Sequence, residues 1–408
     1  MKPRTIFLIV LLLMLTFRFG IKLLNDYPAW DFFPTYNAAK YIVTKSDIYG
    51  DLHISAQYTR SPAFALLLYP LGLFPRNLAA FIWCLLSAAS LGLTFVLCAK
   101  LFVRKNKGSF FFWLVAAPLT LILLSRPMIS QFLMGQVDLI MLLFVMLAIY
   151  FREKGRVVPA ALFLALASSI KVTPLIFLPY FLFRRDFKLI GFYGIFSLAI
   201  LFLPAPFVSW KHNLSLLGSW FHNLYVFYPH EATTPQDAWY QSLYFFLKRF
   251  VFSDKFNISL FNGPAEYARY LNYLLFAMLY LFVLIRPRRD KGISMTLIDY
   301  NILVISMVIF SPLAADYTYM NLAVPIVFLL YAFKDYALFR HPVFAVSAAV
   351  FLILNYFTGN KAFRLIGINS IGGESYCYLV VMTLVWQALV LLFLLLMLKY
   401  NSKVTGKV

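Results

Sequence analysis

The stretch "MKPRTIFLIVLLLMLTFRFGIKLL" (residues 1–24) decides the fold class of this chain. Two basic residues open it, and the apolar run that follows is long enough for a helix to cross the hydrocarbon core of a bilayer, which takes about 20 residues. The run resembles a secretory signal peptide, but no small-residue cleavage site follows it. We therefore expect an uncleaved first transmembrane helix.

The remainder of the chain is as apolar as its beginning. Of 408 residues, 62% are hydrophobic, only 13% are charged, and 44 are Phe. A water-soluble core cannot bury so much apolar surface, whereas a bilayer accepts it on the outside of the protein. No polar stretch is long enough for a soluble domain, so we expect one integral-membrane domain over residues 1–408.

The distribution of apolar runs predicts an all-α fold, a polytopic transmembrane helical bundle. Shorter runs among them indicate tilted, broken or buried helices. We expect twelve membrane segments, at residues 5–24, 78–103, 109–124, 137–151, 158–170, 173–183, 189–208, 265–285, 296–310, 320–333, 343–357 and 377–398.

Basic residues outnumber acidic ones, 36 to 16, and their positions indicate the orientation in the membrane. Lys and Arg accumulate in cytoplasmic loops of membrane proteins, so the excess does not point to a nucleic-acid partner. With a cytoplasmic N-terminus, the following basic residues fall inside: Arg104, Lys105, Lys107, Arg152, Lys154, Arg156, Arg184, Arg185, Lys188, Arg286, Arg288, Arg289, Lys291, Lys334, Arg340, Lys399, Lys403 and Lys407. Both termini are then cytoplasmic.

Two long outer connections follow from this orientation. The first, residues 25–77, contains "NAAKYIVTK" (residues 37–45), a candidate interfacial helix, and the second, residues 210–264, is rich in Trp, Tyr and His. Two aromatic loops on one face suggest an extracytoplasmic site at the membrane surface.

Cysteine and histidine positions give no indication of a metal site. Cys84, Cys98 and Cys377 lie in or beside apolar runs and are interpreted as small apolar residues. The histidines of the second outer loop lack the i, i+3 or i, i+4 spacing of helical metal ligands. We expect neither a metal nor another cofactor.

The first outer connection places a carboxylate among aromatic residues, in "AWDFFPTYNAAKYIVTKSDIYG" (residues 29–50). Asp31 follows Trp30 and precedes Phe32 and Phe33, near the outer interface. An acidic group there is costly unless it has a partner or a chemical task. The alternative is an ordinary aspartate, solvated at the end of a helix.

Motifs through most of the chain resemble those of glycosyltransferase family 87, a family of polyprenol-phosphate-sugar-dependent enzymes that includes phosphatidylinositol-mannoside mannosyltransferases. The stretch "DFFPTYNAAK" is similar to the family's Asp-Phe-x-x-Tyr-x-Ala-Ala opening after the first helix. Further matches follow in order: "DIYG", "SPAFALLLYPLGLFP", "GQVDLIMLLFVMLAIYFREKGR", "PAALFLALASSIKVTPLIFLPYFLFRRDFK", "YQSL" and "SPLAADYTYMNLAVP".

The resemblance implies a membrane glycosyltransferase of the GT-C type, with Asp31 as the catalytic base. The chemistry agrees, because a lipid-phosphate sugar carries a leaving group that needs no general acid, and one carboxylate suffices where a glycosidase needs two. We expect transfer of a hexose, with mannose favoured, from a polyprenyl-phosphate sugar to an extracytoplasmic lipid or glycan acceptor, with inversion. The implied location is a bacterial inner membrane.

Three cations are candidates for binding the donor phosphate. Lys171, in "SSIKVTP", lies where two short apolar runs meet on the outer side, and an ammonium suits a phosphate. Its alternative role is to snorkel from a helix end. Arg126, in "LLSRPMIS", and Arg60, in "YTRSP", have similar positions.

Five other polar residues are candidates for contacting the sugar or the acceptor: Gln136, Asp138, Gln241, Asp316 and Tyr317. An alternative role for Gln136 is to cap a helix. The family usually has Asn at the position of Asp138, and often His at that of Tyr317.

Two other classes of protein remain as alternatives. A transporter or flippase for a lipid-linked sugar would share an aromatic, basic groove, but transporters carry ionisable groups near the bilayer midplane and often have two similar halves. A structural or assembly protein would leave the polar residues of the outer loops without a task. Membrane lipids are expected partners in every case.

Overall fold

The computed structural model describes residues 2–25, 29–44, 47–49, 58–103, 108–227, 240–252, 264, 266–285, 295–311, 313–335, 338, 341–358, 360–369 and 382–400. Every regular element in these ranges is a helix. Several predicted loop cations, at residues 104–107, 286–291, 340, 403 and 407, lie outside the described residues, as does Cys377.

The chain divides into two compact units. The first comprises Met1–Leu101 and Ile129–Glu231, and the second comprises Phe102–Met128 and Ala232–Val408.

The first unit contains five of the nine candidate site residues, most of them at the ends of helices or between helices. The helices of this unit are α1 (Pro3–Leu15), η1 (Thr16–Gly20), α2 (Ile21–Leu24), α3 (Phe32–Tyr41), η2 (Ile42–Thr44), α5 (Pro62–Leu67), α6 (Tyr69–Gly72), α7 (Arg76–Phe102), the C-terminal part of α10 (Ser125–Met134), α11 (Asp138–Glu153), α12 (Val157–Ile170), η5 (Thr173–Ile176), α13 (Phe177–Phe183), α14 (Phe187–Phe202), α15 (Ala205–Val208) and α16 (Trp210–Phe227).

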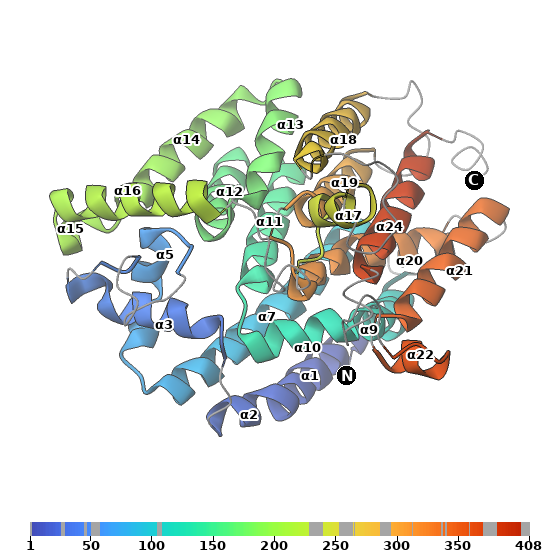
Figure 1. The fold of residues 1–408 in the computed structure, drawn as a ribbon, viewed down its shortest axis with the longest axis horizontal. Coiled ribbons are helices and arrows are strands. Elements are labelled where there is room, and N and C mark those ends of the chain that lie inside the picture. Colours follow the sequence, from blue (N-terminus) through green and yellow to red (C-terminus); the bar gives the residue numbers. More distant parts are fainter. Residues whose placement is uncertain are drawn as a thin grey trace. The chain divides into compact units, whose positions relative to one another are not determined.

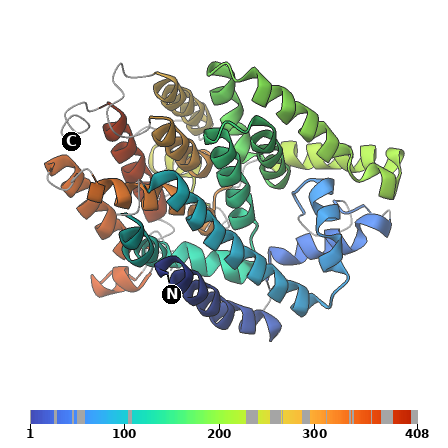
Figure 2. The same ribbon diagram turned by 180° about the vertical axis from the view of Figure 1, so that it is seen from behind.

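Helix α12 packs against both α11 and α14 (Figure 1). Helix α1 lies along α7, seen as two blue helices in Figure 2, and Phe7 meets Phe95 edge-on with ring centroids 5.6 Å apart. Gly92 allows the close approach, because a Cβ there would lie 3.1 Å from a methyl carbon of Leu8. Helix α3 packs on α5 and α6 and contributes Ala38 to a small apolar core.

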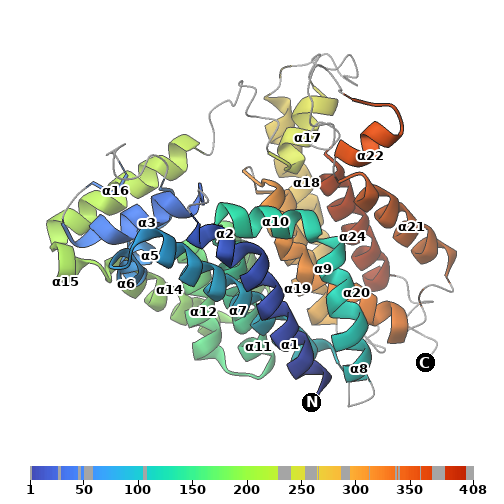
Figure 3. The ribbon, with the colours of Figure 1, turned by 90° about the horizontal axis from the view of Figure 1, so that it is seen from below.

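The second unit is also entirely helical in its described residues. It contains α8 (Ser109–Phe111), η4 (Phe112–Ala116), α9 (Ala117–Leu123), α17 (Leu243–Phe250), α18 (Tyr267–Leu284), α19 (Met295–Ile309), η8 (Asp316–Leu322), α20 (Ala323–Asp335), α21 (Pro342–Tyr356), α22 (Asn360–Leu365) and α24 (Thr383–Tyr400). Helix α24 packs against α19 and α21, as Figure 3 shows for α21.

Each of the twelve predicted membrane segments overlaps a helix or a run of consecutive helices. Within the described residues, six helical stretches are long and apolar enough to cross a bilayer: Pro3–Leu24, Arg76–Phe102, Phe187–Val208, Tyr267–Leu284, Asp316–Lys334 and Thr383–Tyr400. The bent pair Ser109–Leu123 and Ser125–Met134 makes a seventh if it counts as one span. The described residues therefore form a helical membrane bundle, and twelve crossings stays a prediction.

The candidate interfacial stretch, residues 37–45, overlaps a helix that begins earlier than expected. Helix α3 begins at Phe32, with Pro34 in its first turn, where a missing backbone N–H costs no helical hydrogen bond. It continues through Tyr41 into η2. Its position in the membrane interface stays a prediction.

Candidate active site

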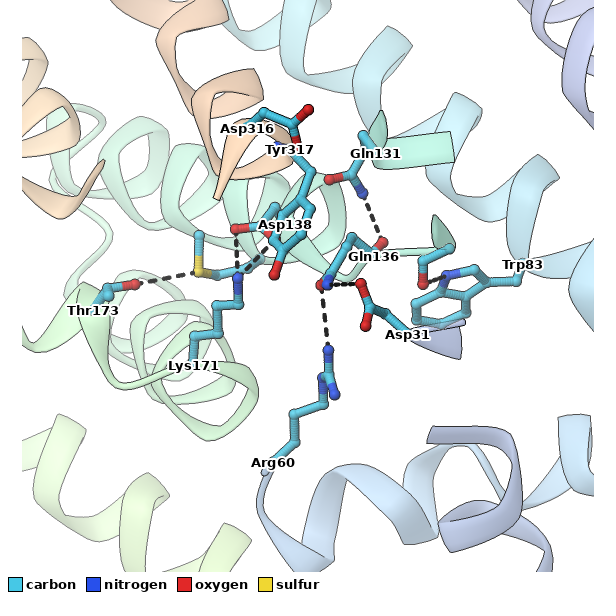
Figure 4. A network of polar contacts seen from close by, with 12 residues as sticks. Asp31, Arg60, Trp83, Gln131, Gln136, Asp138, Lys171, Thr173, Asp316 and Tyr317 are labelled. Carbon is cyan, nitrogen blue, oxygen red and sulfur yellow. Dashed lines mark hydrogen bonds and ion pairs between the residues drawn. The ribbon is translucent and has the colours of Figure 1, made fainter. Parts of the chain in front are cut away.

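Asp31 lies immediately before α3, next to the buried Phe32. Its backbone N–H donates to the carbonyl of Met134 at 3.0 Å. Within the described residues its carboxylate makes no capping hydrogen bond to α3. Instead, Oδ2 of Asp31 accepts a hydrogen bond of 2.6 Å from Nε2 of Gln136 (Figure 4). The carboxylate is thus held by the turn between α10 and α11.

That turn is held in place by contacts on both sides. Gln131 and Gln136 exchange two hydrogen bonds: the Gln136 N–H donates to the Gln131 backbone carbonyl at 3.1 Å, and Nε2 of Gln131 donates to the Gln136 carbonyl at 2.6 Å. Between them, the carbonyl of Gly135 accepts from Nε1 of Trp83 at 2.9 Å. Because both glutamines and this tryptophan are buried, water competes little for these bonds.

Gly135 allows the turn to approach Asp31 so closely. Its φ is +69°, in the left-handed region that favours glycine, and a Cβ there would lie 2.6 Å from the Cβ of Phe32. An added methyl group would therefore push the turn away from the residue that follows Asp31.

We expect Gly135→Ala to lower any activity that uses the Asp31 carboxylate by roughly 10- to 100-fold, because a displacement of about 1 Å at a reacting group has effects of that order. The measurement is the activity of purified protein at matched amounts of monodisperse material.

Gly155→Ala is the matched control for backbone strain. Gly155 has a φ of +71°, but nothing lies within 4 Å of the position of its Cβ. It should carry only the strain of the left-handed conformation, about 1–2 kcal/mol, and retain its activity once folded. Equal activity of the two variants would contradict the steric argument.

Arg60 contacts the same glutamine from another element. Its Nη2 donates to Oε1 of Gln136 at 3.3 Å, and the residue is 7% exposed. Within the described part of the chain, its buried Nε has no hydrogen-bond partner. A buried guanidinium with unused donor capacity is suited to an anionic ligand.

The backbone around Arg60 is fixed by two side chains. The hydroxyl of Tyr49 donates to the Arg60 carbonyl at 2.7 Å, and Nε1 of Trp220 donates to the Thr59 carbonyl at 3.0 Å. Burial raises the pKa of Tyr49 well above its usual value, so the phenol remains a donor even in alkaline solution. These bonds fix the approach of Arg60 to Gln136.

Lys171 and Asp138 form an ion pair. Nζ of Lys171 lies 2.8 Å from Oδ1 and 2.7 Å from Oδ2 of Asp138. The Asp138 side chain is fully buried in the first turn of α11, where a negative charge is favoured by the helix dipole, while 25% of the Lys171 side chain is exposed. The pair therefore buries its carboxylate and leaves part of the lysine accessible.

The remaining four predicted site residues belong to the second unit. Nε of Arg126 lies 3.5 Å from Oδ2 of Asp316, whose Oδ1 accepts from the Tyr317 backbone N–H at 2.9 Å. The backbone of Gln241 donates to Ala314 at 2.6 Å. Its carbonyl accepts from the buried hydroxyl of Tyr319.

The structure thus connects three predicted residues directly, Asp31, Gln136 and Arg60, and forms two ion pairs among the others, Lys171 with Asp138 and, in the second unit, Arg126 with Asp316. Sequence reasoning missed Trp83, Gln131 and Gly135, which build the turn that holds Asp31. Gln131 could have been recognised from the sequence, because it is a polar residue within the apolar stretch that precedes "GQVD".

The fold and these contacts define a class of protein: a helical membrane protein in which a partly buried carboxylate shares a glutamine partner with a buried arginine. A model of glycosyltransferase family 87 matches residues 58–312. The chain therefore belongs to glycosyltransferase family 87 and is an integral-membrane glycosyltransferase. No curated protein matches it. The matched residues include Arg60, Gln136 and Lys171 but not Asp31.

Proposed function

We propose that this glycosyltransferase transfers a hexose, mannose being favoured, from a polyprenyl-phosphate sugar to an extracytoplasmic lipid or glycan acceptor. The whole chain acts as one membrane domain in a bacterial inner membrane. Both termini are cytoplasmic, and the site faces the opposite side.

The observation that carries this proposal is the fixed carboxylate of Asp31. Nε2 of Gln136 donates a hydrogen bond to Oδ2 of Asp31, and within the described residues Oδ1 has no hydrogen-bond partner. Asp31 is only partly buried, so a hydroxyl can reach it. A base must lie within hydrogen-bond reach of the proton that it removes, and an oriented, accessible oxygen meets that condition.

The proposed reaction is a single displacement. The acceptor hydroxyl gives its proton to Oδ1 of Asp31 as its oxygen forms a bond to the anomeric carbon of the donor. The bond between that carbon and the phosphate oxygen breaks, and polyprenyl phosphate leaves with the electron pair. The attack comes from the face opposite the leaving group, so the anomeric configuration inverts.

Cations stabilise the charge on the departing phosphate. Arg60, with its unused buried Nε, and Lys171, through its exposed part, are the candidates in the first unit. Arg126, in the second unit, is a third. Asp138 contacts the Lys171 ammonium with both carboxylate oxygens and so fixes its direction. The proposed contacts of Gln241, Asp316 and Tyr317 with the sugar or acceptor belong to the same reaction.

The test is a comparison of donors with purified protein in liposomes. Labelled polyprenyl-phosphate mannose, polyprenyl-phosphate glucose and a sugar nucleotide are each supplied with a lipid extract as acceptor. We expect a new glycosidic product, inverted at the anomeric carbon, only from a polyprenyl-phosphate sugar. Transfer from the nucleotide sugar would contradict the donor class, and movement of intact donor across the bilayer would indicate a flippase.

A further inference from the structure

The amide of Gln136 has an orientation that its two neighbours determine. Arg60 carries only hydrogen-bond donors, so the atom of Gln136 that faces it must be Oε1. The other amide atom, Nε2, then faces Asp31, whose carboxylate accepts at 2.6 Å. The three side chains form a directed series of hydrogen bonds from guanidinium to amide to carboxylate (Figure 4).

Gln136 is poorly placed to contact a substrate itself. It is 3% exposed, its backbone N–H and carbonyl are both bonded to Gln131, and each of its amide atoms already has a partner. Asp31, by contrast, is only partly buried. The accessible group of this series is therefore the carboxylate, and the amide lies behind it.

We propose that Gln136 is a positioning residue, which orients the carboxylate of Asp31 for proton removal, and that Arg60 holds the amide in the productive orientation. The inference rests on the proposed function, in which Asp31 is the base. The hydrogen bond to Oδ2 limits rotation of the carboxylate and leaves Oδ1 for the acceptor hydroxyl.

The first test is Gln136→Met, which keeps the side-chain length but removes both the donor and the acceptor. We expect kcat for transfer to fall roughly 10- to 100-fold while KM for donor and acceptor changes little, because substrate binding does not use the amide. Gln387→Met is the matched control: Gln387 is 1% exposed, and its Nε2 has no partner among the described residues. It should transfer at the normal rate.

The second test, Gln136→Glu, has a readout that a merely structural role would not change. A carboxylate at position 136 still accepts from Arg60 but repels Asp31, whereas a protonated one donates to it as the amide does. Arg60 faces the side chain of residue 136 directly, and Asp138, two residues further along the chain, is paired with Lys171. The activity of this variant relative to the normal protein should rise as the pH falls from about 8 to about 6, and that of Gln136→Met should not.

The role of Arg60 is tested by a double-mutant cycle with Arg60→Gln and Gln136→Met. Arg60 is also a candidate for the donor phosphate through Nε, so its action through the amide is measured as the coupling between the two changes: the double variant should lose less than the product of the two single losses. If the loss of kcat in the double variant equals the product of the two single losses, Arg60 acts separately from the amide, and that part of the inference is overturned.

The outcomes separate this inference from the proposed function. If Gln136→Met keeps normal kcat while Asp31→Asn is inactive, Gln136 does not position the base and the proposed function stands. A large rise in KM with unchanged kcat would make Gln136 a substrate contact instead. If Asp31→Asn transfers normally, the base assignment fails and this inference fails with it.

Discussion

Asp31→Asn should abolish most of the transfer activity, with a fall in kcat of about 10²- to 10⁴-fold, the usual contribution of a general base. Asparagine has the same shape and can still accept the hydrogen bond from Gln136, so the start of α3 should remain in place. What it loses is the ability to take a proton. The measurement is single-turnover transfer from polyprenyl-phosphate sugar, which isolates the chemical step.

Asp47→Asn is the matched control for this prediction. Asp47 lies in the same predicted outer connection, is exposed, and accepts a hydrogen bond of 3.0 Å from the backbone N–H of Tyr49, which asparagine can also accept. Its transfer rate should stay within a factor of about two, as for a surface substitution that keeps its local bond. If Asp31→Asn keeps more than a tenth of the normal transfer rate, Asp31 is not the base.

The sequence predicted the helices well because membrane segments depend on composition. Runs of about 20 apolar residues and basic loops can be recognised without any knowledge of packing. Asp31 was also recognisable, as a carboxylate among aromatic residues. The contact between Asp31 and Gln136 could not be predicted, because the two residues lie 105 positions apart in the sequence. The contact also depends on the fit of Gly135 against Phe32.

The pairing of Lys171 with Asp138 was within reach of sequence reasoning. Helices α11 and α12 have similar lengths, 16 and 14 residues, and a short connection separates them. Two such helices pack as an antiparallel hairpin, so the first residue of one lies near the last residue of the other. Treating the two residues as separate site candidates overlooked this geometry.

Lys399 was interpreted only as a cytoplasmic basic residue, but the structure gives it a further role. In the second unit its ammonium lies 2.6 Å from Oδ1 of Asp299 on α19, and the exposed fractions of the two side chains are 0% and 1%. It also donates to the carbonyls of Phe282, at 3.1 Å, and Val283, at 2.6 Å, in the last turn of α18. One lysine therefore joins α18, α19 and α24.

Lys399→Met should be strongly destabilising, by about 3–5 kcal/mol, because it leaves Asp299 as an uncompensated buried charge. It also removes the cation from the end of α18, where carbonyl groups favour positive charge. We expect the apparent melting temperature in detergent to fall by on the order of 10 °C, as measured by loss of monodisperse protein on heating. Lys334→Met is the control, because Lys334 is exposed at the end of α20 in the same unit and should change little.

The double variant Lys399→Met/Asp299→Leu decides whether charge is the cause. Replacing both members of a buried pair with apolar residues is often neutral or stabilising, so the double variant should recover most of the lost stability. Asp299→Asn alone should cost less than Lys399→Met, since the lysine keeps its two carbonyl partners on α18. If the double variant is less stable than Lys399→Met, the lysine contributes chiefly by joining the three helices rather than by compensating Asp299.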